Sequence, residues 1–306
     1  MTGAPILEVQ NLTRAYRKGG LFGGSSFKAV DDVSFTLPAE PQVFSIVGES
    51  GSGKTTIARM ILRLVEPSEG SIRLLGRPLS GKSSDRIDNT EFRRLVQPIF
   101  QNPFEAFSAY LPVEFYLRRT ALNLKIARTD AQAVEATDLA LKSVGLSYER
   151  IRGKYIRQFS GGELQRISVA RALIPKPKLI VADEPVSMVD ASLRMSIVNL
   201  FRQIVEEQGV SFIYITHDLS TAYYLSDQVS IMNTGRVVES GAPTRILDNP
   251  TQAYTRELMA AIPTVGQRWG ELAEIDRKFG YADTRQKSAS THQTINHNAQ
   301  CDRRKP

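Results

Sequence analysis

The sequence has almost no cysteine and no long apolar run. Its one cysteine, Cys301, cannot form an internal disulfide or a metal site built from several cysteines, which fits a reducing compartment. No segment approaches the roughly 18 to 20 consecutive apolar residues that cross a bilayer. Residues 1–5 lack a basic flank followed by an apolar stretch. We therefore expect a cytoplasmic protein.

The excess of positive over negative charge is also small in the body of the chain. The formal net charge is +7, but residues 281–306 hold five Lys/Arg against two Asp/Glu and so account for +3 of it. The remaining +4 is spread over 280 residues with both signs interleaved, which is typical of an ordinary solvated surface. The composition therefore does not predict a nucleic-acid partner.

The 306 residues, 42% of them apolar, can fill the core of one large α/β domain or of two small ones. Residues 103–158 lack strong strand signals and carry alanines at helical spacing, which predicts a mainly helical insertion. From about residue 281 Ser, Thr, Gln and Asn dominate and periodicity is lost, so we expect a disordered tail over residues 281–306.

Elsewhere the apolar spacing predicts strands that alternate with helices. Strands are expected at residues 6–12, 33–37, 43–47, 71–75, 96–100, 179–182, 210–215, 229–232 and 237–239. Helices are expected at residues 54–64, 193–204, 219–225 and 252–261, and a Gly-rich loop at 19–26. The first two helices carry buried stripes, formed by Ile57, Met60, Ile61 and Leu64 and by Leu193, Ile197, Leu200 and Ile204.

Residues 48–55 read Gly-Glu-Ser-Gly-Ser-Gly-Lys-Thr and match the P-loop pattern, between a predicted strand and a predicted helix. The backbone N–H groups of such a loop, together with the positive end of the helix, bind phosphate oxygens. Lys54 is expected to reach the β- and γ-phosphates, and Thr55 to bind Mg²⁺. The predicted nucleotide-binding residues here are Gly48, Glu49, Ser50, Gly51, Ser52, Gly53, Lys54, Thr55 and Thr56.

An acidic pair, Asp183 and Glu184, ends the predicted strand 179–182. We expect this strand to run beside the P-loop strand and to deliver both carboxylates to the nucleotide at the carboxyl edge of the sheet. Neighbouring strand residues point to opposite sides, so the strand end must twist. Asp183 is then the Mg²⁺ ligand and Glu184 the catalytic base. The alternative is an acidic pair in a solvated loop.

Ser160-Gly161-Gly162-Glu163, after the helical insertion, resembles the signature of ABC ATPases, whose usual form is Leu-Ser-Gly-Gly-Gln. Here Phe159 and Glu163 replace its two ends, while the Ser-Gly-Gly core is intact. The resemblance implies that this segment grips the γ-phosphate of ATP held by a partner's P-loop. It also implies an α/β fold with a RecA-like P-loop NTPase core, a mainly parallel sheet, an antiparallel β subdomain and a helical ABC subdomain.

Further positions match the same family one by one. Gln101 resembles the glutamine that senses Mg²⁺ and the attacking water, with a surface loop amide as its alternative. Asp190 resembles the aspartate of the loop that crosses the dimer interface. His217 resembles the switch histidine that contacts the γ-phosphate, with an ordinary loop residue as its alternative. Tyr16 resembles the aromatic residue that stacks on adenine, with core packing as its alternative.

Residues 249–256, Asn-Pro-Thr-Gln-Ala-Tyr-Thr-Arg, continuing to Ala-Ile-Pro at 261–263, resemble the C-terminal segment of oligopeptide and dipeptide importer ATPases. Residues 101–104 look like their Gln-Asp-Pro-Phe loop. Residues 105–110 and 155–158 depart from the typical sequence, at the surface where this family's helical lobe touches the permease. Nickel and oligosaccharide importers share this ATPase type, so nickel and oligosaccharides are the alternative substrates.

The resemblance implies an ATP-hydrolysing subunit of an importer, peripheral to the cytoplasmic face of the inner membrane, with ATP and Mg²⁺ as cofactors. Its ABC domain would span residues 6–262, with a C-terminal extension over 263–280. Implied partners are two transmembrane permease subunits, a second ATPase subunit that is identical or paralogous, and indirectly a substrate-binding protein. An exporter ATPase would lack the segment 249–263. A soluble ABC protein acting on ribosomes or DNA would carry two cassettes, a coiled coil or a zinc insertion.

Overall fold

The computed structural model describes residues 3–18, 25–80 and 85–261. The chain divides into two compact units, residues 1–255 and 256–306, and only 256–261 of the second are described. Most of the predicted Gly-rich loop, the C-terminal extension and tail, and Cys301 lie outside the described residues. Among the helices that are described, none has the length and apolar character needed to span a bilayer.

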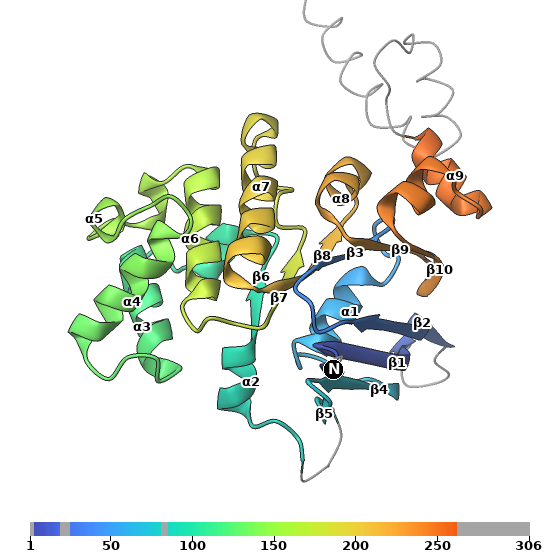
Figure 1. Ribbon diagram of the computed structural model, residues 1–306, viewed down its shortest axis with the longest axis horizontal. Coiled ribbons are helices and arrows are strands. Elements are labelled where there is room, and N and C mark those ends of the chain that lie inside the picture. Colours follow the sequence, from blue (N-terminus) through green and yellow to red (C-terminus); the bar gives the residue numbers. More distant parts are fainter. Residues whose placement is uncertain (1–2, 19–24, 81–84, 262–306) are drawn as a thin grey trace, which may run out of the picture. The chain divides into compact units, whose positions relative to one another are not determined.

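A six-stranded sheet with the order β10-β9-β3-β8-β7-β6 forms the centre of the first unit (Figure 1). Its neighbouring strands are parallel except for β10, which is antiparallel to β9. The P-loop NTPase fold class is confirmed. The strands are β3 (Val43–Val47), β6 (Val96–Ile99), β7 (Leu179–Asp183), β8 (Ser211–Thr216), β9 (Gln228–Asn233) and β10 (Arg236–Gly241).

The expectation that the strand ending at Asp183 runs beside the P-loop strand is wrong. Strand β8 lies between β3 and β7 and pairs with both. Spatial order in such a sheet is set by the helical crossovers, and the apolar pattern of a single strand carries no information about its neighbours. All three strands are parallel, so their carboxyl ends still meet at one edge of the sheet.

Both faces of the sheet are covered. In β7, Leu179 and Val181 pack with α1 and the smaller sheet, whereas Ile180 and Ala182 pack with α6, α7 and the helical region. Successive side chains of a strand point to opposite faces, so a strand buried on both sides must be apolar throughout. This burial explains the continuous apolar run that predicted the strand.

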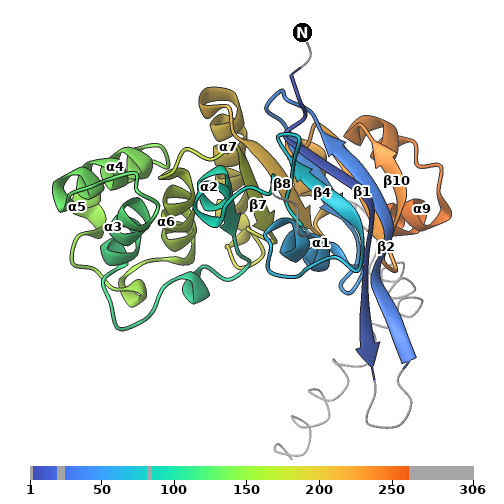
Figure 2. The ribbon, with the colours of Figure 1, turned by 90° about the horizontal axis from the view of Figure 1, so that it is seen from below.

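The smaller sheet is antiparallel, with the order β2-β1-β4-β5. Its first two strands extend beyond the predicted 6–12 and 33–37, because they pair as one long hairpin whose register shifts interrupt the apolar alternation. Figure 2 shows this hairpin projecting from the sheet. The strands are β1 (Leu7–Lys18), β2 (Ser25–Leu37), β4 (Glu69–Leu74) and β5 (Arg77–Pro78).

The described residues 103–158 form helices and no strand, and α3 to α6 gather at the β6 and β7 end of the large sheet (Figures 1 and 2). Shorter helical turns are Pro103–Ala106, Ile156–Gln158 and Thr244–Asp248. The helices are α1 (Lys54–Ile61), α2 (Asn89–Leu95), α3 (Val113–Asn123), α4 (Asp130–Lys142), α5 (Tyr148–Ile151), α6 (Gly161–Leu173), α7 (Ala191–Gln208), α8 (Leu219–Leu225) and α9 (Ala253–Ala260).

Two residues of the predicted buried stripes are exposed. Helix α1 ends at Ile61, and Arg63 adopts a left-handed φ of 57°, so Leu64 leaves the stripe and is 61% exposed. Leu193 is 41% exposed. A Cβ added to Gly162 would lie 3.0 Å from Leu193 Cδ1, so this leucine packs against the start of α6 rather than in the core.

Candidate nucleotide-binding site

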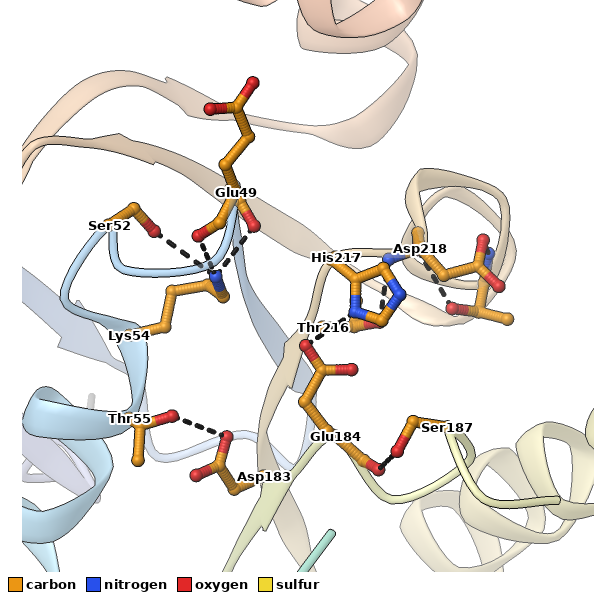
Figure 3. A network of polar contacts seen from close by, with 12 residues as sticks. Glu49, Ser52, Lys54, Thr55, Asp183, Glu184, Ser187, Thr216, His217 and Asp218 are labelled. Carbon is orange, nitrogen blue, oxygen red and sulfur yellow. Dashed lines mark hydrogen bonds and ion pairs between the residues drawn. The ribbon is translucent and has the colours of Figure 1, made fainter. Parts of the chain in front are cut away.

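The P-loop joins β3 to the N-terminus of α1, where Gly53 has the left-handed φ of 105° that only glycine adopts without strain. Lys54 Nζ donates hydrogen bonds to the carbonyl oxygens of Gly48 at 2.7 Å and Glu49 at 2.6 Å (Figure 3). Burial lowers the pKa of Lys54. A buried ammonium within a Gly-rich loop at a helix N-terminus fits an anionic ligand. Of the predicted loop residues, Gly48, Ser52 and Lys54 are buried, Gly53 and Thr56 half-buried, and Glu49, Ser50, Gly51 and Thr55 exposed.

The turn between β9 and β10 supports the P-loop from behind. Gly235 N donates to the carbonyl of Ser52 at 2.9 Å. A Cβ added to Gly48 would lie 2.2 Å from the carbonyl oxygen of Met232, closer than real contacts allow. The path of the loop therefore depends on a bare backbone at Gly48.

We predict that Gly48→Ala displaces the loop from β9 and weakens ATP binding at least about tenfold, because the Met232 carbonyl belongs to a paired strand and cannot yield. Gly51→Ala is the matched control, since Gly51 has a φ of 84° but no atom within 4 Å of an added Cβ. It should cost about 1–2 kcal/mol of backbone strain and leave more of the binding intact. ATP titrations and urea unfolding of both variants measure these effects. Equal losses of affinity would contradict the prediction that the clash between position 48 and the Met232 carbonyl displaces the loop.

Thr55 and Asp183 offer oxygen atoms that fit a magnesium ion. Thr55 Oγ1 donates to Asp183 Oδ1 at 3.3 Å. Burial raises the pKa of Asp183, and the charge of Glu184 adds to this, while the bond from Thr55 and the charge of Lys54 act against it. A half-buried carboxylate beside a hydroxyl is stabilised by a hard cation. In the part of the chain that the structure describes, no group of three or more His, Cys, Asp or Glu could by itself hold a metal ion.

Glu184 lies one residue beyond Asp183 in a left-handed conformation with a φ of 49°. This turn, held by the bond from Glu184 N to the Ile215 carbonyl at 2.9 Å, supplies the twist that the strand end requires. Glu184 Oε1 lies 2.8 Å from His217 Nδ1, and the carboxylate is only 14% exposed (Figure 3). An ionised carboxylate only accepts hydrogen bonds, so this contact fits the tautomer that carries its hydrogen on Nδ1, and Nε2 takes no part in it.

His217 follows β8 and precedes α8, and its neighbour Asp218 fixes this junction. The Asp218 carboxylate accepts hydrogen bonds from Ser220 N at 3.0 Å and Thr221 N at 3.3 Å, and Arg194 of α7 donates to it at 3.1 Å. Asp218 was not among the predicted site residues. An aspartate directly before a predicted helix is a standard N-cap signal, so the sequence did contain this information.

The other predicted residues lie on or beside other elements, namely β6, α7 and β1. Gln101 is exposed just after β6, which ends beside β7. Asp190 is exposed and precedes α7. Tyr16, on β1, is half-buried, with its ring stacked on Phe27 at 5.8 Å between centroids and with the Arg14 guanidinium 4.7 Å from its centroid.

The segment Ser160–Glu163 does not join the Lys54 cluster. It starts α6 with a capping box, in which Glu163 N donates to Ser160 Oγ at 3.2 Å and Ser160 N donates to Glu163 Oε2 at 3.0 Å. The bonds that the Glu163 carboxylate accepts from Ser160 N and from Arg150 hold its pKa below the ordinary value. In both views α6 and α1 are separated by β7 and β8 (Figures 1 and 2), so the helix that begins at Gly161 is not a neighbour of the helix that follows this chain's P-loop.

The family model described as ABC transporter matches residues 30–187. This range covers half of the chain. It contains the P-loop, the segment Ser160–Glu163 and the pair Asp183 and Glu184. The chain belongs to the ABC transporter family. The resemblance inferred from the sequence is thereby confirmed.

Among curated relatives of this ABC family member, the oligopeptide transport ATP-binding protein OppF of Streptococcus mutans is 37% identical over 84% of the chain and 82% of the relative. A putative peptide import ATP-binding protein of Brucella ovis is 38% identical over 86% of the chain and 80% of the relative. A solved dimeric ATP-binding cassette, bound to ADP and Pi after hydrolysis, is 25% identical with a TM-score of 0.65, covering 78% of this chain and 98% of the other.

Proposed function

We propose that this chain is the ATP-hydrolysing subunit of an ABC importer for oligopeptides or dipeptides. The observation that carries this proposal is the convergence of three features at one edge of the sheet. They are the P-loop with Lys54, the oxygen atoms of Thr55 and Asp183, and Glu184 with its contact to His217. The names of the relatives support the peptide substrate. Import of oligosaccharides or nickel by the same ATPase is the alternative.

In this mechanism the P-loop N–H groups and Lys54 bind the triphosphate. Thr55, Asp183 and Gln101 would hold Mg²⁺, which neutralises phosphate charge. Glu184 takes a proton from the attacking water, whose oxygen bonds to the γ-phosphorus as the bond to the leaving ADP oxygen breaks. His217 orients Glu184 through Nδ1 and faces the γ-phosphate with Nε2.

A second ATPase subunit, identical or paralogous, would complete each site. The separation of α6 from α1 within one chain supports this, because it fits a segment Ser160–Glu163 that contacts ATP held by another subunit. Exposed Asp190 would lie in the interface between the subunits. The relative solved with ADP and Pi is dimeric.

The proposed domain spans residues 6–262, with the helical region 103–158 docked on two transmembrane permease subunits and residues 263–280 as an extension before the tail. The subunit would be peripheral to the cytoplasmic face of the membrane and would act with a substrate-binding protein. Exposed Tyr110 and Phe104, in the helical region, support a protein contact there.

A pull-down of the tagged full chain from gently solubilised membranes, with and without ATP, tests this proposal. We expect two permeases and a peptide-type binding protein to copurify, and a second ATPase if the pair is mixed. If an oligosaccharide- or nickel-type binding protein copurifies instead, the substrate would be an oligosaccharide or nickel and not a peptide. Ribosomal or DNA-repair proteins in place of permeases would overturn the transport role and leave the ATPase chemistry standing.

A further inference from the structure

The outer edge of β2 lies directly against the P-loop. Strand β2 is at the edge of its sheet, and the carbonyl oxygen of Ala29 would be only 2.3 Å from a Cβ added to Gly53. Two residues farther along β2, Asp31 N donates to the carbonyl of Gly235 at 2.8 Å. Gly235 belongs to the turn that supports the same loop. The position of β2 relative to a bound phosphate chain is therefore fixed by backbone contacts.

Phe27 lies two residues from Ala29, toward the tip of the hairpin. Two residues of strand span about 7 Å, which is the scale of the ribose that separates a nucleotide's phosphates from its base. At this place the Phe27 ring is 52% exposed, although a large apolar side chain gains free energy from burial. Its surface is thus available to a flat apolar group.

The Phe27 ring is also held in place. It is directly opposite Tyr16 in the β1–β2 pairing, and the two rings are stacked with an interplanar angle of 29°. The Arg14 guanidinium lies 4.7 Å from the Tyr16 centroid and is itself anchored to the Glu66 carbonyl at 2.9 Å. Tyr16 therefore contacts both Arg14 and Phe27, and Phe27 is the more exposed of the two rings.

We propose that Phe27 is a base-contacting residue, which forms with Tyr16 an aromatic platform for the nucleobase. This rests on the proposed nucleotide binding and deepens it. Stacking on a ring follows the area of the base, so the platform favours a purine over a pyrimidine. The phosphates are bound by other residues, so the contribution of Phe27 is confined to ligands that carry a base.

The test compares Mg-ADP, Mg-CDP and pyrophosphate binding to the full chain by titration calorimetry, since none of these ligands is hydrolysed at its terminal phosphate by the proposed reaction. Phe27→Ala is expected to weaken ADP binding about 3- to 10-fold, to lower the ADP-to-CDP preference, and to leave pyrophosphate binding unchanged. Phe27→Tyr should restore ADP affinity. Phe115→Ala, the same change at an exposed ring of α3, is the control and should leave the affinities for all three ligands unchanged.

Unchanged ADP binding in Phe27→Ala would overturn the proposal, and so would equal losses for ADP and pyrophosphate, because these would indicate a disturbed hairpin. A native chain that binds neither ADP nor pyrophosphate would instead overturn the proposed nucleotide binding itself. The two failures are therefore distinguishable.

Discussion

Glu184→Gln is expected to lower ATP turnover about 10²-fold or more while ATP binding persists, because the amide keeps the shape of the carboxylate but cannot accept a proton from water. The amide oxygen can still accept the bond from His217 Nδ1, which is 2.8 Å from the carboxylate in the native chain. Steady-state phosphate release and ATP titration measure the two effects separately. With hydrolysis blocked, the ATP-bound variant should also accumulate as a dimer, which size-exclusion chromatography would detect.

Glu206→Gln is the matched control for this variant. Glu206 lies near the C-terminal end of α7, is 61% exposed and pairs with Arg202 at 2.8 Å. Its substitution removes a carboxylate without touching the proposed base, so turnover should stay at the native value. Full turnover in Glu184→Gln would refute the assignment of the base.

Lys54→Ala is expected to weaken ATP binding about 10- to 100-fold, because charge-assisted hydrogen bonds to phosphate contribute roughly 1.5–3 kcal/mol. Burial lowers the pKa of Lys54 below its ordinary value. The protonated form is thus disfavoured in the folded chain, and this cost is present at neutral pH and disappears as pH rises through the lysine's pKa. The alanine variant should therefore unfold in urea no more easily than the native chain at neutral pH.

Lys142→Ala removes a positive charge at an exposed position on α4, where Lys142 pairs with Asp138 at 2.7 Å, and should bind ATP normally. Native ATP affinity in Lys54→Ala would contradict the assignment of Lys54 to phosphate binding. Loss of affinity together with a lower urea midpoint would indicate that Lys54 bonds to Gly48 and Glu49 mainly stabilise the loop.

The sequence predicted the parts of the site that depend on local chemistry. The P-loop pattern, the acidic pair and the order of strands and helices along the chain follow from residue type and spacing, and the P-loop and β3 lie where they were expected. The neighbours of β7 could not be predicted this way, because adjacency in a sheet is a property of distant segments. The exposure of Leu64 was missed for a similar reason, since α1 ends where Arg63 turns to donate to the carbonyls of Leu79 and Ile87.

Some features of the site also depend on tertiary structure and could not be predicted from residue type and spacing. The left-handed backbone of Glu184 brings its carboxylate to His217, and no spacing rule for strands would have predicted a φ of 49° at a glutamate. The stacking of Tyr16 on Phe27 depends on the hairpin register, which was hidden by register shifts between the two strands.

The turn at Gly235, which backs the P-loop through its bond to Ser52, also bears on how the chain is made. Synthesis runs from the N-terminus, so the P-loop sequence leaves the ribosome about 180 residues before the segment that fixes its backbone. A nascent chain that ends after β7 contains the whole phosphate-binding sequence but lacks β8, β9 and the supporting turn. Nucleotide affinity would therefore arise late, and ATP would stabilise only chains whose central sheet is already complete.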